Sequence, residues 1–90
     1  MEIKLSNKFL KQVRKLVENK PNLKVKINQA IIDFAEHKRQ ATCFRKKLKG
    51  QWHGYEELEI GGDMRMIIRV NKEQTRAIFE RIGTHSQLGL

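Results

Sequence analysis

The chain begins with a short alternating stretch and continues with helical periodicity. In "EIKLS", the apolar residues Ile3 and Leu5 alternate with polar ones, which predicts a short strand. Ser6 is a suitable helix N-cap, and Leu5 and Leu10 have the spacing of a hydrophobic staple, so we expect a helix from about Asn7. Its predicted buried stripe contains Phe9, Val13, Leu16 and Val17, with Leu10 beside them.

A second helix is predicted after the segment "NKPN", whose proline interrupts the first one. We expect it to run from about Asn22 to Gln40 and to form an antiparallel hairpin with the first helix. Its inward-facing residues are predicted to be Leu23, Ile27, Ala30, Ile31 and Phe34.

From Cys43 onward the hydrophobic period falls to two, which is typical of strands. Gly61 and Gly62 form the first predicted hairpin turn, with Asp63 directly after it, and "NKEQ" forms the second. One face of these strands is predicted to present Leu58, Ile60, Met64, Met66, Ile68, Val70, Ile78 and Ile82. The opposite face is predicted to present Tyr55, Glu57, Glu59, Arg65, Ile67, Arg69, Phe79 and Arg81.

The predicted fold is therefore α+β, in a single domain that spans residues 1–90. An N-terminal strand precedes a two-helix hairpin, and a three-stranded antiparallel meander follows. The helices are expected to cover one face of a small four-stranded sheet.

The amino-acid composition indicates what kind of partner the protein binds. Lys and Arg total 19 against 10 Asp and Glu, a formal net charge of +9, which favours a polyanion such as nucleic acid. An anionic membrane or an acidic protein remains an alternative. With one cysteine, Cys43, the chain has neither an internal disulfide nor a Cys-based zinc cluster, and His37 and His53 lack metal-ligand spacing. We expect no cofactor, no metal and no membrane span, and a cytoplasmic location.

The candidate chemistry lies on the sheet face without helices. Alternation and hairpin pairing place Glu57, Glu59, Arg65 and Arg81 there, and His85 follows the last strand. RNA cleavage needs such groups: a base for the 2′-OH proton, cations for the charged transition state, and an acid for the departing 5′-oxygen. That scheme requires no metal.

Each of these residues also has a structural explanation. His85 can be a surface or capping residue, and the two glutamates can pair with cations on neighbouring strands. Trp52 and Tyr55 can stack on a base or can cap the end of the core. These patterns alone predict a basic α+β domain that binds RNA.

Longer motifs make the sequence more specific. "KKLKGQWHGYEELEIGGDMRMIIRV", followed by "FERIGTHSQL", resembles the RelE superfamily of toxins from bacterial type II toxin–antitoxin modules, most closely its YafQ branch. The resemblance spans nearly the whole chain. It implies an mRNA endonuclease that enters the ribosomal A site, cuts the codon there, and is neutralised by a cognate antitoxin.

The resemblance also implies roles for individual residues. The terminal histidine of the YafQ motif corresponds to His85, and its aspartate after the turn to Asp63. Lys46 and Glu59 stand where that branch usually has histidines. Arg65 resembles the arginine that the related RelE and YoeB branches use on phosphate.

Our mechanistic hypothesis combines these assignments. Glu59 or Asp63 would accept the 2′-OH proton, and His85 would protonate the 5′-oxygen, since an imidazole can donate a proton near neutral pH. Arg65 and Arg81 would hold the scissile phosphate.

The basic segment before the meander completes the predicted site. Lys46 would add positive potential at the reaction centre and activate the nucleophile. Lys47, Lys49, Trp52 and Tyr55 are predicted to bind RNA.

The C-terminal segment is expected to carry His85 back over the same face. Gly83 would let the chain turn, and the Thr84 hydroxyl would hold that turn by a hydrogen bond. Leu88 and Leu90 would pin the tail.

Two other functions fit parts of the pattern. One is a gyrase inhibitor of the ParE kind, which shares the scaffold but lacks the acid–base residues. The other is a non-catalytic RNA- or ribosome-binding module, for which the net charge alone would suffice.

Overall fold

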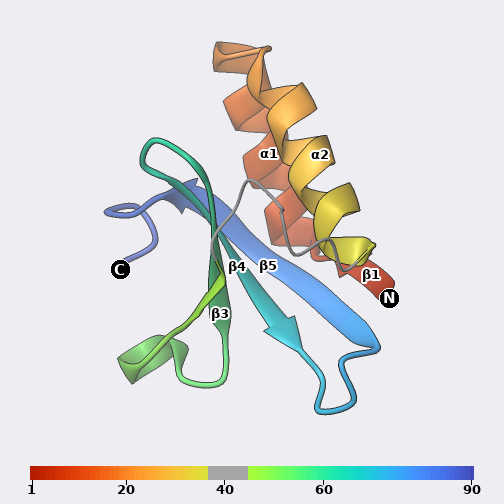
Figure 1. The fold of residues 1–90 in the computed structure, drawn as a ribbon. Coiled ribbons are helices and arrows are strands. Elements are labelled where there is room, and N and C mark those ends of the chain that lie inside the picture. The colour runs from red at the N-terminus through yellow and green to blue at the C-terminus, as the bar shows by residue number, and fades with distance from the viewer. Residues whose placement is uncertain (37–44) are drawn as a thin grey trace.

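The computed structural model describes residues 1–36 and 45–90 and contains helices packed on a mixed sheet (Figure 1). In chain order the elements are β1 (Glu2–Leu5), α1 (Asn7–Asn19), α2 (Leu23–Ala35), β2 (Arg45–Lys47), the 3-10 helix η1 (Gly50–Trp52), β3 (Glu56–Gly61), β4 (Met64–Val70) and β5 (Arg76–Thr84). The strand order is β1-β5-β4-β3-β2. β1 is parallel to β5, and the other pairs are antiparallel.

The predicted α+β order of strand, helix pair and meander is confirmed, but the predicted strand number is wrong. The sheet has five strands because Arg45, Lys46 and Lys47 pair with β3. A run rich in lysine carries no apolar alternation, so its strand was not visible in the sequence. The predictions for His37, Gln40 and Cys43 lie outside the described residues.

α1 begins where the sequence indicates. The Ser6 hydroxyl accepts a hydrogen bond from the backbone N–H of Phe9 (3.0 Å) and donates one to the carbonyl oxygen of Glu80 (2.9 Å). The cap therefore also ties α1 to β5. Leu10, predicted to join the buried stripe, is instead 37% exposed.

The core lies between the two helices and the sheet. Phe79 of β5 contacts Phe9 of α1 and Phe34 of α2, each in an edge-to-face arrangement with ring centroids 5.7 Å apart. The other fully or largely buried members of this cluster are Ile27, Ala30, Leu58, Ile60, Met66, Ile68, Ala77 and Ile82. Both helices thus cover one face of the sheet.

Phe79 corrects the predicted facing of β5. Arg81 pairs with Ile67 and Phe79 pairs with Ile68, so Glu80 is an extra residue, a β-bulge, in β5. The bulge reverses the alternation within the strand. Phe79 consequently faces the helices, whereas the sequence predicted that it faces away from them.

The hairpin between β3 and β4 is shifted by one residue from its predicted position. Gly61 pairs with Met64, so Gly62 and Asp63 are the two turn residues. Gly61 and Gly62 have positive φ angles of 118° and 54°, which glycine adopts readily because it has no Cβ.

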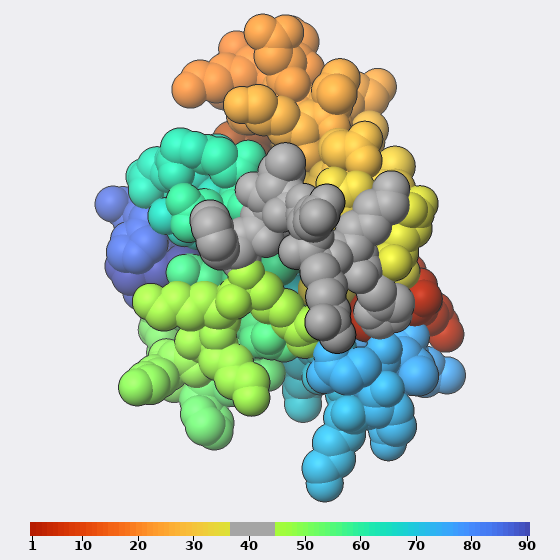
Figure 2. Space-filling model, viewed as in Figure 1, coloured from red at the N-terminus to blue at the C-terminus, as the bar shows by residue number. Residues whose placement is uncertain are grey.

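The sheet face opposite the helices is called the open face below. Figure 2 shows residues 45–55, in light green to green, in the lower left part of the view, away from the turn between α1 and α2, which is orange at the top. Within residues 1–36 and 45–90, neither helix has the length and apolar composition needed to cross a membrane.

Candidate functional site

Strand pairing arranges the side chains of the open face in rows. Lys46 of β2, Glu57 of β3, Ile67 of β4 and Arg81 of β5 are successive cross-strand partners. Paired residues project to the same face of a sheet, so these side chains form one row. The next row contains Glu59, Arg65 and Gly83.

A groove of about 460 Å³ opens beside the first row. Its polar and aromatic lining residues are Lys46, Lys47, Lys49, Gln51, Trp52, Glu57 and His85. We call it the His85 groove. Three lysines, one carboxylate and one imidazole therefore converge on a single concavity.

The C-terminal tail positions His85 by backbone contacts. The His85 N–H donates to the carbonyl oxygen of Asp63 (3.1 Å), and the His85 carbonyl accepts from the N–H of Leu90 (3.0 Å). As expected, the Thr84 hydroxyl holds the turn, accepting a hydrogen bond from the N–H of Gln87 (3.2 Å). The imidazole itself is exposed.

Gly83 does not make the turn, contrary to the prediction, because it is the penultimate residue of β5. It is buried, and a Cβ at this position would lie 3.0 Å from Gln87 Oε1 and 3.5 Å from Leu88 Cδ2. A side chain here would therefore press on Gln87 of the tail by a few tenths of an ångström. Leu88 is 7% exposed, as expected of a residue that pins the tail.

Trp52 fastens the tail from the other side of the groove. Its indole Nε1 donates to the carbonyl oxygen of Leu88 (3.0 Å), and its ring contacts that of Tyr55 edge-to-face at 5.3 Å. Tail and η1 together cover part of the open face, which explains why Ile67 is fully buried although it faces away from the helices.

The three carboxylates of this region, Glu57, Glu59 and Asp63, differ in whether they line the His85 groove. Glu59 Oε1 lies 3.8 Å from Arg65 Nη2, and neither Glu59 nor Asp63 lines the His85 groove. Glu57 lines it, is half-buried, and forms no hydrogen bond or ion pair within the described part of the chain. Sequence reasoning placed Glu57 on this face but gave it no role; its register position opposite Lys46 was the missing signal.

The two arginines hold neighbouring backbone. Arg65 Nη1 donates to the carbonyl oxygens of Gly62 and Met64 (3.1 Å each), and its side chain is 15% exposed. Arg81 Nη1 donates to the carbonyl oxygen of Glu80 (2.8 Å) and lies 3.6 Å from that residue's carboxylate. Both guanidinium groups are next to the groove rather than in its lining.

The structure thus divides the predicted site. The groove brings together five of its residues: His85, Lys46, Lys47, Lys49 and Trp52. Five others lie outside the lining: Glu59, Asp63, Arg65, Arg81 and Tyr55.

Comparisons with solved structures show the same fold in bacterial toxins. A metal-bound toxin from Helicobacter pylori superposes with a TM-score of 0.82 at 26% identity, covering 98% of each chain. YafQ from Escherichia coli strain BL21(DE3) gives 0.80 at 24% identity, over 97% of this chain and 96% of that one. YafQ in the E. coli DinJ–YafQ complex gives 0.78 at 25% identity, over 97% and 96%.

No curated protein sequence matches the chain. The family model described as the bacterial toxin YafQ of type II toxin–antitoxin systems, however, matches residues 1–89. Since that match spans nearly the whole chain, the protein belongs to the YafQ family of type II toxin–antitoxin toxins, within the RelE superfamily.

Proposed function

We propose that this toxin is a ribosome-dependent mRNA endonuclease that acts in the bacterial cytoplasm and is neutralised by a cognate antitoxin. The observation that carries the proposal is the His85 groove, where the exposed His85 and a carboxylate without a partner among the described residues share one basic concavity. Family membership supports it, as does the neighbouring structure of YafQ in complex with DinJ.

The proposed reaction is attack of a ribose 2′-oxygen on the adjacent phosphorus. The 2′-OH proton passes to a carboxylate, the bond from phosphorus to the 5′-oxygen breaks, and the imidazolium of His85 protonates that oxygen. The products are a 2′,3′-cyclic phosphate and a 5′-hydroxyl.

Glu57 is the better candidate for the base than Glu59 or Asp63. It lines the same groove as His85, and it has no partner in the described residues that competes for its oxygens. Glu59, by contrast, faces Arg65. The proton donor and acceptor would then flank a phosphate bound between β3 and the tail.

Cations would stabilise the charge of the transition state. Lys46 lies in the groove directly across from Glu57, and Arg81 is in the same row. Arg81 retains guanidinium N–H groups beyond the one bonded to Glu80, which suits phosphate binding. Arg65 would mainly hold the turn between β3 and β4 while adding positive potential.

The H. pylori toxin is described as metal-bound, which raises the question of a metal here. Across residues 1–36 and 45–90, no three His, Cys, Asp or Glu side chains are grouped so that they could hold an ion. The donor set of the groove therefore does not fit a metal centre. Proposed cleavage uses side chains alone and should persist in a chelator.

Expression in bacteria tests the function directly. The wild-type chain should arrest growth and produce message fragments whose ends, mapped by primer extension, fall within codons. His85→Gln should lower cleavage about 10²- to 10⁴-fold, the usual contribution of a general acid. Intact message together with inhibited DNA supercoiling would instead establish a gyrase inhibitor.

A matched pair of variants tests the base. Glu57→Gln and Glu59→Gln remove the same charge from the same strand and face. We expect Glu57→Gln to abolish most cleavage and Glu59→Gln to retain most of it, with similar melting temperatures. The reverse order would assign the base to Glu59.

A further inference from the structure

β2 brings Lys46 into the His85 groove, although the strand has little packing of its own. Its three residues, Arg45, Lys46 and Lys47, are all exposed, and none of them is apolar. An edge strand of this kind gains little from the hydrophobic effect, because it buries little apolar surface. Polar contacts must therefore keep β2 paired with β3 and Lys46 opposite Glu57.

Arg45 provides such contacts on the helix side of the sheet. Its Nε and Nη2 donate to the two oxygens of Glu56, at 2.6 and 2.9 Å, in the bidentate arrangement that suits a guanidinium and a carboxylate. Nη2 also donates to Gln74 Oε1 (3.0 Å), and the guanidinium carbon lies 5.4 Å from the centroid of the Phe34 ring. One side chain thus joins β2 to β3, to α2 and to the turn between β4 and β5. We call this cluster of Arg45, Glu56, Gln74 and Phe34 the Arg45 clamp.

The ion pair of the Arg45 clamp is better shielded from water than an ordinary surface pair. The side chains of Arg45 and Glu56 are 38% and 14% exposed. Arg76 and Glu2, by contrast, make a single 3.3 Å contact, and their side chains are 71% and 70% exposed. Open pairs contribute little because water and salt screen them, whereas two parallel hydrogen bonds to a largely buried carboxylate hold a fixed geometry.

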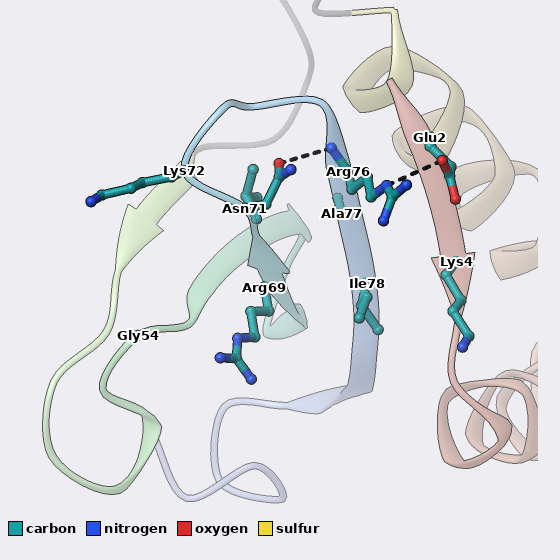
Figure 3. A pocket seen from close by; sticks show the side chains of 10 residues that line it. Glu2, Lys4, Gly54, Arg69, Asn71, Lys72, Arg76, Ala77 and Ile78 are labelled. Carbon is teal, nitrogen blue, oxygen red and sulfur yellow. Dashed lines mark hydrogen bonds and ion pairs between the residues drawn. The ribbon is translucent and has the colours of Figure 1, made fainter.

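The turn that presents Gln74 to Arg45 is itself ordered. Gln74 has a φ of 60°, a conformation that a residue with a Cβ keeps only where its surroundings hold it. Its N–H donates to the carbonyl oxygen of Asn71 (3.1 Å). The Asn71 side-chain oxygen accepts hydrogen bonds from the N–H groups of Thr75 and Arg76 (2.9 Å each), and Figure 3 shows the bond to Arg76, where β5 begins. Arg45 therefore binds to a point that the turn holds in place.

Strand alternation turns this anchor into a position for Lys46. Arg45 pairs with the core residue Leu58, so its side chain lies on the helix side, where it reaches Glu56. Neighbouring residues of a strand project to opposite faces, so Lys46 lies on the open face, across from Glu57. A slip of β2 by one residue would turn Lys46 to the helix side and out of the groove. The bonds from Arg45 to Glu56 hold the register that prevents this slip.

We propose that Arg45 is a positioning residue of the toxin: the Arg45 clamp fixes β2 so that Lys46 stays in the His85 groove opposite Glu57. This inference rests on the proposed nuclease function, in which Lys46 stabilises the charge of the transition state. Arg45 does not line the groove. It therefore acts through Lys46 and not through a contact with the message.

Arg45→Lys tests this role, because it keeps the positive charge and loses the fork that grips both oxygens of Glu56. The control is Arg76→Lys, which makes the same exchange in an open ion pair of the same sheet. Arg45→Lys should lower the single-turnover rate of message cleavage on ribosomes roughly 10- to 100-fold, the cost of a misplaced group. The toxin concentration that gives half the maximal rate should stay nearly constant. Arg76→Lys should change neither quantity.

A second background separates positioning from a general loss of structure. In Lys46→Gln the ammonium group that Arg45 positions is absent, so adding Arg45→Lys should lower the cleavage rate by no more than about twofold further. Equal fold losses from Arg45→Lys with and without the Lys46 side chain would overturn the positioning role.

Amide hydrogen exchange reports on the Arg45 clamp without any cleavage. The Leu48 N–H donates to the carbonyl oxygen of Tyr55 (3.0 Å) just beyond β2. In Arg45→Lys this amide and those of β2 should exchange faster, while the amides of β4 and β5 should not. Unchanged exchange in β2 would overturn the inference.

The positioning role and the nuclease function fail in different ways. Normal cleavage by Arg45→Lys would overturn the positioning role and leave the nuclease in place. Absence of cleavage by the wild-type chain would overturn the nuclease and the positioning role together.

Discussion

Gly83 shows at the scale of one residue how the groove depends on close packing. It lies within a regular strand, where its backbone conformation is open to any residue, yet a side chain there would meet the tail. Gln87 Oε1, the nearest atom, also accepts a hydrogen bond from the Thr84 N–H at 2.8 Å. A shift of that atom by a few tenths of an ångström would stretch this bond.

Gly83→Ala should therefore displace the tail. We expect a loss of about 1–3 kcal/mol in the free energy of unfolding, typical of overpacking, and a larger proportional loss of cleavage because His85 moves. Chemical denaturation and a cleavage assay measure the two effects. Ser86→Ala, at an exposed position of the same tail, is the control and should change neither the free energy of unfolding nor the cleavage rate. Unchanged cleavage in Gly83→Ala would show that cleavage does not depend on the position of the tail.

Trp52 offers a second test of the tail. Trp52→Phe keeps an aromatic ring but removes the N–H that donates to Leu88, a hydrogen bond worth about 1 kcal/mol. Cleavage should fall, and amide hydrogen exchange in residues 84–90 should become faster. Tyr55→Phe is the control, since no hydrogen bond to its hydroxyl is found in the described residues. Equal exchange rates in both variants would contradict this role.

At the scale of elements, β5 controls the arrangement of both faces. The bulge at Glu80 lets Phe79 enter the core while Arg81 stays on the open face beside Ile67. Ser6 binds the carbonyl of the bulged residue, so the start of α1 and the irregularity of β5 stabilise each other. In a regular strand without the bulge, Phe79 and Arg81 are two residues apart and would share a face.

Alanine substitutions in β5 test which of its side chains face the helices. Phe79→Ala should cost about 3–5 kcal/mol in the free energy of unfolding, because the ring lies between both helices and is fully buried. Ile78→Ala, on the half-buried outer position, should cost much less. Denaturation curves that rank the two in the opposite order would refute the bulge.

At the scale of the whole molecule, the sheet separates two tasks. One face packs against the helices and provides most of the buried apolar surface, while the other carries the charged rows, the tail and the His85 groove. The net charge of +9 adds a long-range attraction for polyanions that does not depend on any single contact.

RNA affinity should accordingly fall steeply with salt. If each of the three lysines of the His85 groove contacts one phosphate, with about 0.7 per contact in single strands, the slope of log affinity against log salt concentration should be about 2 in magnitude. Titrations of a single-stranded 2′-O-methyl RNA oligonucleotide, which lacks the attacking hydroxyl, at several salt concentrations give this slope. A slope near zero would show that phosphate contacts do not drive binding.

The sequence by itself determined the features that repeat or that act over a few residues. Ser6 capped the predicted helix, the inward residues of α2 followed the helical period, and the alternation of β3 and β4 assigned Glu57, Arg65 and Arg69 to the open face. These follow from local geometry, because helix and strand periods are properties of the backbone.

Only the tertiary structure decided what depends on contacts between distant segments. The strand at Arg45–Lys47 exists through pairing with β3, and the bulge at Glu80 reverses a facing that strict alternation predicts. Glu57, rather than Glu59, shares a groove with His85 because the tail folds over β3 and is held there by Trp52 and Gly83. Pairing partners and packing partners far apart in the chain leave no periodic signal, so a site assembled from them becomes visible only when the chain is folded.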